Sequence, residues 1–142
     1  MEYDLEVDAT LENLRRVTNF VVQAAQAAGL SDQEIYQCEL AVDEVCANII
    51  EHGVSASGED SRYFIRTATR LENNEFVITI SDNCTPFNPL GHMRSNTDSL
   101  EAKLQPGGWG IYFAHEQMDS LEYDYYNRQN HLTLRKRVNA SG

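Results

Sequence analysis

The run ELAVDEVCANIIEHG, from Glu39 to Gly53, constrains the fold more than any other part of the chain. It carries two stripes of side chains at helical spacing. Glu44, Asn48 and His52 recur every four residues, which places them on one face of a helix. A neighbouring apolar stripe is formed by Ile35, Cys38, Val42, Val45 and Ile49. The run therefore predicts a helix that buries its apolar stripe and presents its polar one.

The polar stripe has two interpretations. A carboxylate, a carboxamide and an imidazole on successive turns can act together on one small ligand, as a proton acceptor, an oxygen ligand for a hard cation and a donor to an anion. The stripe can equally be the solvated face of an ordinary amphipathic helix. The residues downstream have to decide between the two.

Length and charge exclude several classes of function. With 142 residues, the chain is expected to form one domain with one buried core. Its 11 basic and 22 acidic residues give a net charge of −11, which opposes direct binding to nucleic acid or to an anionic membrane. No apolar stretch is long enough to span a membrane, and the acidic start MEYDLEVD is unlike a secretory signal, so we expect a cytoplasmic protein. The three cysteines lack zinc or redox spacing and are expected to be reduced.

The first part of the chain reads as a strand followed by two helices. Alternation at Tyr3, Leu5 and Val7 predicts a strand with one solvated face. A helix is expected from Thr10 until Gly29, and a second one is expected from Ser31, with Glu34 completing a capping box, until Gly53.

The remainder reads mostly as sheet. Residues 54–60 have the composition of a loop, and residues 62–71 and 76–81 are expected to form a hairpin joined through 72–75. Residues 85–106 hold all three prolines and form a connection long enough to suggest a functional, mobile loop. A helix after Gly110 and a second hairpin, with strands 121–126 and 131–138 around residues 127–130, complete the chain.

Gly107, Gly108 and Gly110 precede the last helix. Glycines in this position let backbone N–H groups approach an anion, and the helix N-terminus adds a favourable dipole, so the stretch is a candidate phosphate cradle. Simple turn glycines are the alternative. Neither a P-loop motif nor a dinucleotide fingerprint is present.

Asp82 ends a predicted strand and begins the turn SDNCTPFNP. Its carboxylate can cap the turn, or it can accept a hydrogen bond from an exocyclic amine such as that of adenine.

The order of these motifs resembles one superfamily. The chain has E-x-x-x-N-x-x-x-H-G on a helix, D-x-x-x-P-F after a strand, and G-G-x-G-I before a helix. This order resembles the ATP-binding domain shared by gyrase, its heat-shock chaperone relative, histidine kinases and MutL. Within it, EVCANIIEHG, GGWGIYFAHEQMDSLEY and the closing N-x-L-x-L-x-K are most similar to the anti-sigma factor kinases, the serine-protein kinases of bacterial sporulation and stress partner-switching.

That resemblance implies a fold and a reaction. The fold would be a two-layer α/β sandwich of the Bergerat type, with helices on one face of a mixed, mostly antiparallel sheet and an ATP lid at about residues 90–106. The reaction would transfer a phosphoryl group from ATP·Mg²⁺ to a serine of an anti-sigma-factor antagonist. A sigma factor would be the second partner, and the chain would be a homodimer.

The resemblance also implies roles for single residues. Glu44 would be the general base, Asn48 the Mg²⁺ ligand and Asp82 the adenine reader. Arg16 would contact the partner, and His52 would lie near the phosphates. The remaining nucleotide-binding positions of the matched motifs are Cys84, Phe87, Gly107, Gly108, Gly110 and Ile111.

One position departs from the family pattern. Cys84 stands where the adenine turn usually has glycine, and its side chain could narrow the pocket or force the turn into another conformation. A glycine there would restore room and access to positive φ. Two alternatives therefore stay open: a non-catalytic, nucleotide-gated binding module that sequesters a regulator, and a detached histidine-kinase catalytic domain.

Overall fold

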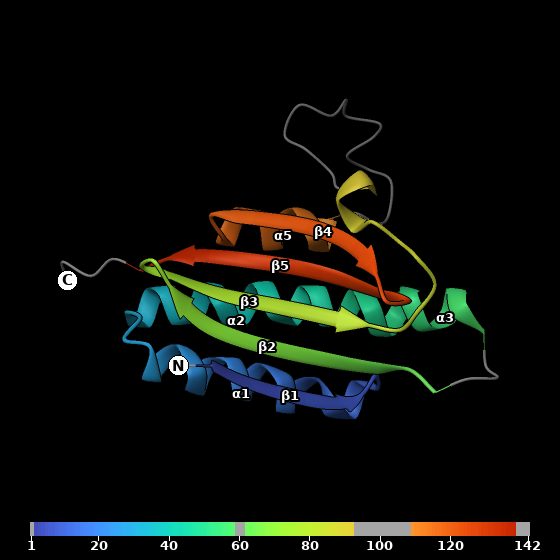
Figure 1. Ribbon diagram of the computed structural model, residues 1–142, viewed down its shortest axis with the longest axis horizontal. Coiled ribbons are helices and arrows are strands. Elements are labelled where there is room, and N and C mark those ends of the chain that lie inside the picture. The colour runs from blue at the N-terminus through green and yellow to red at the C-terminus, as the bar shows by residue number, and fades with distance from the viewer. Residues whose placement is uncertain (1, 59–61, 93–108, 139–142) are drawn as a thin grey trace.

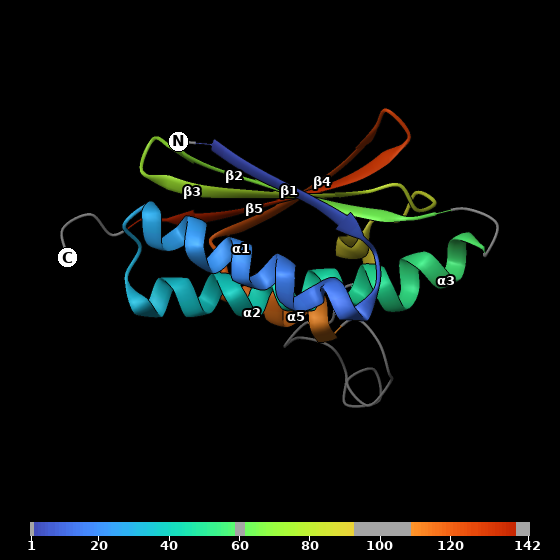
Figure 2. The same ribbon diagram turned by 90° about the horizontal axis from the view of Figure 1, so that it is seen from below.

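The protein has two layers. The structure, a computed structural model, describes residues 2–58, 62–92 and 109–138. Figure 1 shows the sheet in front of the helices, and Figure 2 shows that the helices α1, α2 and α5 all lie on the same side of that sheet. This is the two-layer sandwich with helices on one face that the sequence predicts.

Helices and strands alternate unevenly along the chain. The strands are β1 (Glu2–Asp8), β2 (Phe64–Glu72), β3 (Glu75–Asp82), β4 (Ser120–Tyr126) and β5 (Gln129–Arg137). The helices are η1 (Leu11–Asn13), α1 (Leu14–Ala27), α2 (Asp32–Asn48), η2 (Ile49–Gly53), α3 (Val54–Ser57), η3 (Pro89–His92) and α5 (Trp109–Gln117). The expected lid, apart from η3, lies outside the described residues.

The five described strands form one sheet in the order β1-β2-β3-β5-β4. Each neighbouring pair is antiparallel, so the described sheet has no parallel pair and is more regular than the mixed sheet expected. Because β5 lies between β3 and β4, the last hairpin brings its own residues beside the end of β3. Asp82 on β3 is thereby paired in register with Asn130 on β5.

The core lies between the sheet and the helices. Val17 and Val21 of α1 are buried, as are Val42 and Val45 of α2. The strands contribute Ile65, Ile78, Ile80 and Leu134 from the face that points toward the helices. This burial confirms the apolar stripe predicted for the second helix, with Ile35 and Ile49 at its partly buried ends.

Local signals set the helix ends. The Ser31 hydroxyl accepts from the Glu34 amide, and the Glu34 carboxylate accepts from the Ser31 amide, which is the predicted capping box. Gly29 has φ +87°, the left-handed conformation that ends α1 as predicted.

Both hairpins turn in two residues. Asn73 and Asn74 have φ of +51° and +63°, and Asn127 and Arg128 have φ of +53° and +59°. Positive φ at both central positions defines the type I′ turn, whose twist matches that of the flanking strands. The strands therefore extend further into both turns than the sequence predicts, and Asn130 belongs to β5.

The second helix does not stop at Gly53. Residues Ile49–Gly53 form one π-helical turn, α3 continues to Ser57, and the chain leaves the helix at Gly58, which has φ +94°. Gly53 itself is helical, with φ −63° and ψ −50°. The prediction that Gly53 ends the helix and that residues 54–60 form a loop was wrong for residues 54–57. None of the described helices has the length and apolar character needed to cross a bilayer.

Candidate functional site

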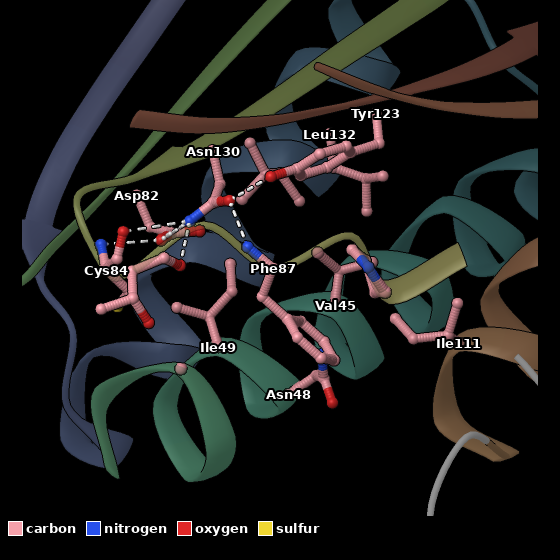
Figure 3. A pocket seen from close by; sticks show the side chains of 14 residues that line it. Val45, Asn48, Ile49, Asp82, Cys84, Phe87, Ile111, Tyr123, Asn130 and Leu132 are labelled. Atoms are coloured by element: carbon pink, nitrogen blue, oxygen red, sulfur yellow. Dashed lines mark hydrogen bonds between the residues drawn. The ribbon is translucent and has the colours of Figure 1, made fainter. Parts of the chain in front are cut away.

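A cavity opens between α2, the turn after β3 and the N-terminal end of α5. Its volume is about 430 Å³, open mouth included. The walls are mostly apolar, and Asp82, Asn130, Tyr123 and Asn48 bring polar groups to it (Figure 3). The other lining residues are Val45, Ile49, Gly53, Ile80, Cys84, Thr85, Phe87, Pro89, Ile111 and Leu132. An apolar pocket with few polar groups is typical of sites for flat organic ligands.

Asp82 lies at the closed end of this cavity and is 5% exposed. Its Oδ1 accepts from Asn130 Nδ2 at 2.9 Å and from the Cys84 amide at 3.0 Å (Figure 3). Burial raises the pKa of the Asp82 carboxyl, and these hydrogen bonds oppose the rise because they favour the ionised form. The arrangement presents a desolvated carboxylate, oriented by the protein, to whatever enters the cavity.

Asn130 is the residue that the sequence prediction missed. Its Nδ2 also donates to the carbonyls of Cys84 and Thr85, and its Oδ1 accepts from the Phe87 amide at 3.0 Å and from the Tyr123 hydroxyl at 2.5 Å. The signal was present in the spacing N-x-L-x-L, because Asn130 shares strand parity with Leu132 and Leu134 and must face the helices.

Cys84 fits its position without a left-handed backbone. It is 2% exposed and is not among the described residues with positive φ. Its Sγ would lie 3.3 Å from a Cβ atom added to Gly53. The helical glycine thus leaves space for the cysteine side chain, and the turn conformation does not require glycine at position 84. Burial raises the pKa of the Cys84 thiol to about 12, which leaves it protonated and unreactive at neutral pH.

Glu44 and Asn48 lie one helical turn apart on α2. Asn48 lines the cavity, whereas Glu44 lies beside it against Gly110, where an added Cβ atom would be 2.7 Å from Glu44 Oε2. Gly110 is in the first turn of α5, where unpaired N–H groups favour a nearby carboxylate. Partial burial, followed by the charges of Asp43 and Glu51, raises the pKa of Glu44.

His52 does not join Glu44 and Asn48. It is exposed and is not among the cavity residues. The physical reason is the π-helical turn that begins at Ile49, since its extra residue per turn rotates the following side chains off a four-residue stripe. The structure therefore places Asn48 in the cavity wall and Glu44 beside it, and it places His52 outside the cavity.

The other predicted residues are distributed as follows. Phe87 and Ile111 line the cavity from two sides. Arg16 is exposed on α1, with its Nη1 donating to Asn13 at 3.3 Å, and it is not a cavity residue. Gly107 and Gly108 lie outside the described residues. Among the residues that the structure describes, no three His, Cys, Asp or Glu side chains form a metal-binding group.

A helix-backed antiparallel sheet with this cavity at one end defines an ATP-binding domain of the Bergerat type. Comparison with protein families matches residues 7–136 to the Histidine kinase-like ATPase domain. The chain belongs to this family, which implies a nucleotide as its ligand.

Solved structures share the fold. The RsbU and RsbW domains of Rv1364c from Mycobacterium tuberculosis match with a TM-score of 0.63 and 18% sequence identity. The match covers 96% of this chain and 32% of that one, so this chain spans about a third of the solved protein. A comparison with curated proteins finds no match.

Proposed function

We propose that the protein is an ATP-dependent serine-protein kinase and anti-sigma regulatory factor. It phosphorylates a serine of an anti-sigma-factor antagonist and binds a sigma factor. Membership of the Histidine kinase-like ATPase domain family supports nucleotide binding. The sequence resemblance to anti-sigma factor kinases supports the protein substrate. The whole chain, 1–142, would form one such domain, with its ATP lid at about residues 90–106.

One observation carries the proposal: Glu44 and Asn48 flank the cavity that ends at Asp82. The adenine would lie against Asp82 between Ile49 and Leu132, which are cavity residues. The phosphates would then extend toward Asn48 and the first turn of α5. That direction brings the terminal phosphate near Glu44, where a serine hydroxyl could approach from solvent.

Glu44 has the properties of a general base. Its pKa is raised because partial burial and the charges of Asp43 and Glu51 disfavour the ionised form. A base with a raised pKa binds the serine proton more strongly. Phosphoryl transfer depends mainly on positioning and charge neutralisation, so this one proton acceptor and a fixed nucleotide would suffice.

The residues present also fit Mg²⁺. This ion keeps several waters and binds nucleotides through one or two protein oxygens, so a cage of several acidic ligands is not needed. Asn48, whose side chain lines the cavity, would supply the protein oxygen. When bound, the ion would neutralise the phosphate charge.

The partners would meet exposed surfaces. Arg16 would contact the antagonist or the sigma factor from α1, where it is exposed. The homodimer would use the edge strand β1, on which Leu5 is only partly buried. The protein would act in the bacterial cytoplasm, without direct nucleic-acid or membrane binding, in agreement with its net charge of −11.

The test is phosphoryl transfer from radiolabelled ATP to a candidate antagonist domain, with Glu44→Gln as the main variant. We expect transfer to fall by about 10²–10⁴-fold, because the amide cannot accept the proton. Nucleotide affinity, measured by calorimetry, should remain within about threefold of wild type, since a general base contributes to rate more than to binding. Full transfer by the variant would contradict the assigned mechanism.

A second candidate function is a nucleotide-gated binding module without kinase activity. The feature that favours it is Cys84, which stands where the adenine turn of the kinases usually has glycine and whose side chain is buried among the cavity residues. If wild-type protein binds ADP and retains a sigma factor but transfers no phosphate to any antagonist, this second function replaces the first.

A further inference from the structure

Asn130 lies at the centre of the cavity wall and uses every polar atom of its side chain. Its Nδ2 donates to Asp82 Oδ1 at 2.9 Å, to the Thr85 carbonyl at 3.1 Å and to the Cys84 carbonyl at 3.3 Å. Its Oδ1 accepts from the amide of Phe87 and the hydroxyl of Tyr123. The side chain is 7% exposed, so these bonds form in a largely desolvated place, where they are strong and costly to lose.

The Phe87 amide and the carbonyls of Cys84 and Thr85 determine which way the Asn130 amide points, since each of these groups can only donate or only accept. A hydroxyl and a backbone amide both donate to Oδ1, and three acceptors surround Nδ2, so the reversed amide would place donors against donors. Burial raises the pKa of Tyr123, which keeps the hydroxyl protonated as a donor. Tyr123 therefore adds a second donor that holds Asn130 in this orientation, and Asn130 in turn holds Asp82 (Figure 3).

This chain of contacts leaves Asp82 with two unlike oxygens. Oδ1 accepts the N–H groups of Asn130 and Cys84. The Cys84 thiol also donates a hydrogen bond to the Asp82 carboxylate, and Oδ2 accepts no N–H group of the described residues. Because Oδ1 is held by these hydrogen bonds, the carboxylate cannot rotate freely. Its remaining lone pairs therefore keep a fixed orientation toward a ligand in the cavity.

We propose that Asn130, held in part by Tyr123, is a positioning residue that gives the site its selectivity for a 6-aminopurine over a 6-oxopurine. This proposal rests on nucleotide binding, the first part of the proposed function. An exocyclic amine donates to the fixed carboxylate, whereas a 6-oxo group places an oxygen against it and leaves Asp82 without a donor. A carboxylate that rotates freely could turn away from the 6-oxo oxygen. A carboxylate held in place cannot, so it discriminates more strongly between the two purines.

Two observations support this role over a merely structural one. Asn130 also holds the turn from Cys84 to Phe87, and Phe87 is itself a cavity residue. On the opposite face of the sheet, the next residue pair in the same register, Ser81 and His131, is joined by a separate hydrogen bond of 2.8 Å. The pairing of β3 with β5 thus has a separate side-chain hydrogen bond on the other face. The Asn130 contacts lie on the face of the cavity.

The experiment compares ADP with inosine diphosphate by calorimetry on the full chain. We expect wild type to prefer ADP by about tenfold or more, because a buried carboxylate facing the 6-oxo group lacks a donor. Asn130→Ala should lose most of that preference, and Tyr123→Phe, which removes only the hydroxyl, should lose part of it. His131→Ala is the matched control on the other face of β5, and its preference should equal that of wild type.

Amide hydrogen exchange without nucleotide supplies an independent readout. The Phe87 amide should exchange faster in Asn130→Ala and unchanged in His131→Ala, since only the first removes its acceptor. Equal losses of affinity for both nucleotides in Asn130→Ala, with the preference unchanged, would overturn the proposal. A third outcome is that wild type binds neither nucleotide while the Phe87 amide exchanges faster in Asn130→Ala. In that case the nucleotide function fails and the selectivity role fails with it, although the hydrogen bonds from Asn130 to the turn are confirmed.

Discussion

Gly110 and Glu44 lie so close that a methyl group on the glycine would come within 2.7 Å of the Glu44 Oε2 atom. The Glu44 carboxylate can occupy this position because residue 110 has no side chain. A Cβ atom there would displace the carboxylate, which is the end of a flexible side chain and can move aside without disturbing the backbone.

Gly110→Ala should consequently reduce phosphoryl transfer and leave stability nearly unchanged. We expect activity to fall by about tenfold or more, since displacing a catalytic group by about 1 Å can cost up to 10²-fold. The free energy of unfolding should change by less than about 1 kcal/mol, because alanine also favours the helix. Wild-type activity of Gly110→Ala would show that the carboxylate position is unimportant.

Glu44→Gln should stabilise the fold in a pH-dependent way. The raised pKa means that the folded protein disfavours the ionised carboxyl, so wild type loses stability as pH rises from the ordinary value of 4.5 through the raised one. The variant should be more stable above this window, by less than about 1 kcal/mol because the group is partly exposed. Below pH 4.5 both side chains are neutral and the difference should vanish. Urea denaturation at pH 4 and pH 8 measures it, and a larger gain at pH 4 would contradict the assigned sign.

Asn48→Ala should weaken nucleotide binding itself, unlike the change at Glu44. Removing the amide oxygen takes away the protein ligand expected for Mg²⁺, and the affinity for ADP should fall by about tenfold or more in the presence of the ion. Without magnesium, calorimetry should find little difference between Asn48→Ala and wild type. An equal loss in both conditions would mean that Asn48 acts by contacting the nucleotide directly.

Cys84→Gly should destabilise the protein and leave nucleotide affinity no higher than in wild type. The backbone at position 84 has no positive φ for glycine to accommodate, and the lost side chain leaves an unfilled space beside Gly53. We expect a loss of about 1–3 kcal/mol, from the cavity and from the added chain entropy. The sequence leads to the opposite expectation, because a glycine at position 84 would restore room and access to positive φ.

A double-mutant cycle tests the contact between Cys84 and Gly53. A Cβ atom at position 53 would be 3.3 Å from Sγ, which requires the neighbour to give way. Gly53→Ala should therefore be less harmful in Cys84→Ala protein than in wild type, with a coupling of about 0.5–3 kcal/mol. Additive effects would show that the two residues do not share this space.

Thr67→Val should stabilise the protein. The Thr67 hydroxyl is fully buried, and its oxygen has no hydrogen-bond partner among the described residues. Replacing the hydroxyl by a methyl removes a desolvation cost of about 1 kcal/mol or more. Thr133→Val, at a partly exposed position, is the control and should have little effect in urea denaturation. A loss of stability in Thr67→Val would indicate a partner for that hydroxyl.

The sequence predicts the elements of this fold well where the signals are local. The capping box at Ser31 and the stop at Gly29 depend on neighbouring residues, and both are confirmed. The strands β2, β3 and β5 also lie where the sequence predicts them, apart from one or two residues at their ends. What local patterns cannot supply is the strand order, and that order brings Asp82 beside Asn130, which is 48 residues away. The role of Asn130 was missed for this reason.

The glycine at position 53 was misinterpreted for a different physical reason. Glycine after a helical pattern is usually a stop, because it adopts positive φ easily. Here its use is the missing side chain, which gives room to Cys84 from a segment 31 positions later. A close approach between distant segments has no periodicity, so it leaves no signal in the neighbouring sequence.

The π-helical turn at Ile49–Gly53 also changes the helical register of the residues that follow it. It amounts to a single-residue insertion in an otherwise α-helical segment, so residues before and after it obey two separate helical phases. Shortening this turn by one residue would bring both halves into one phase and turn His52 toward the side of Asn48. The same deletion would rotate α3 away from the turn that follows β3. It would thereby break the hydrogen bond of 2.8 Å that the Ser57 hydroxyl accepts from the Thr85 amide. One helical phase therefore cannot provide both a histidine on the side of Asn48 and the hydrogen bond from the Thr85 amide to Ser57.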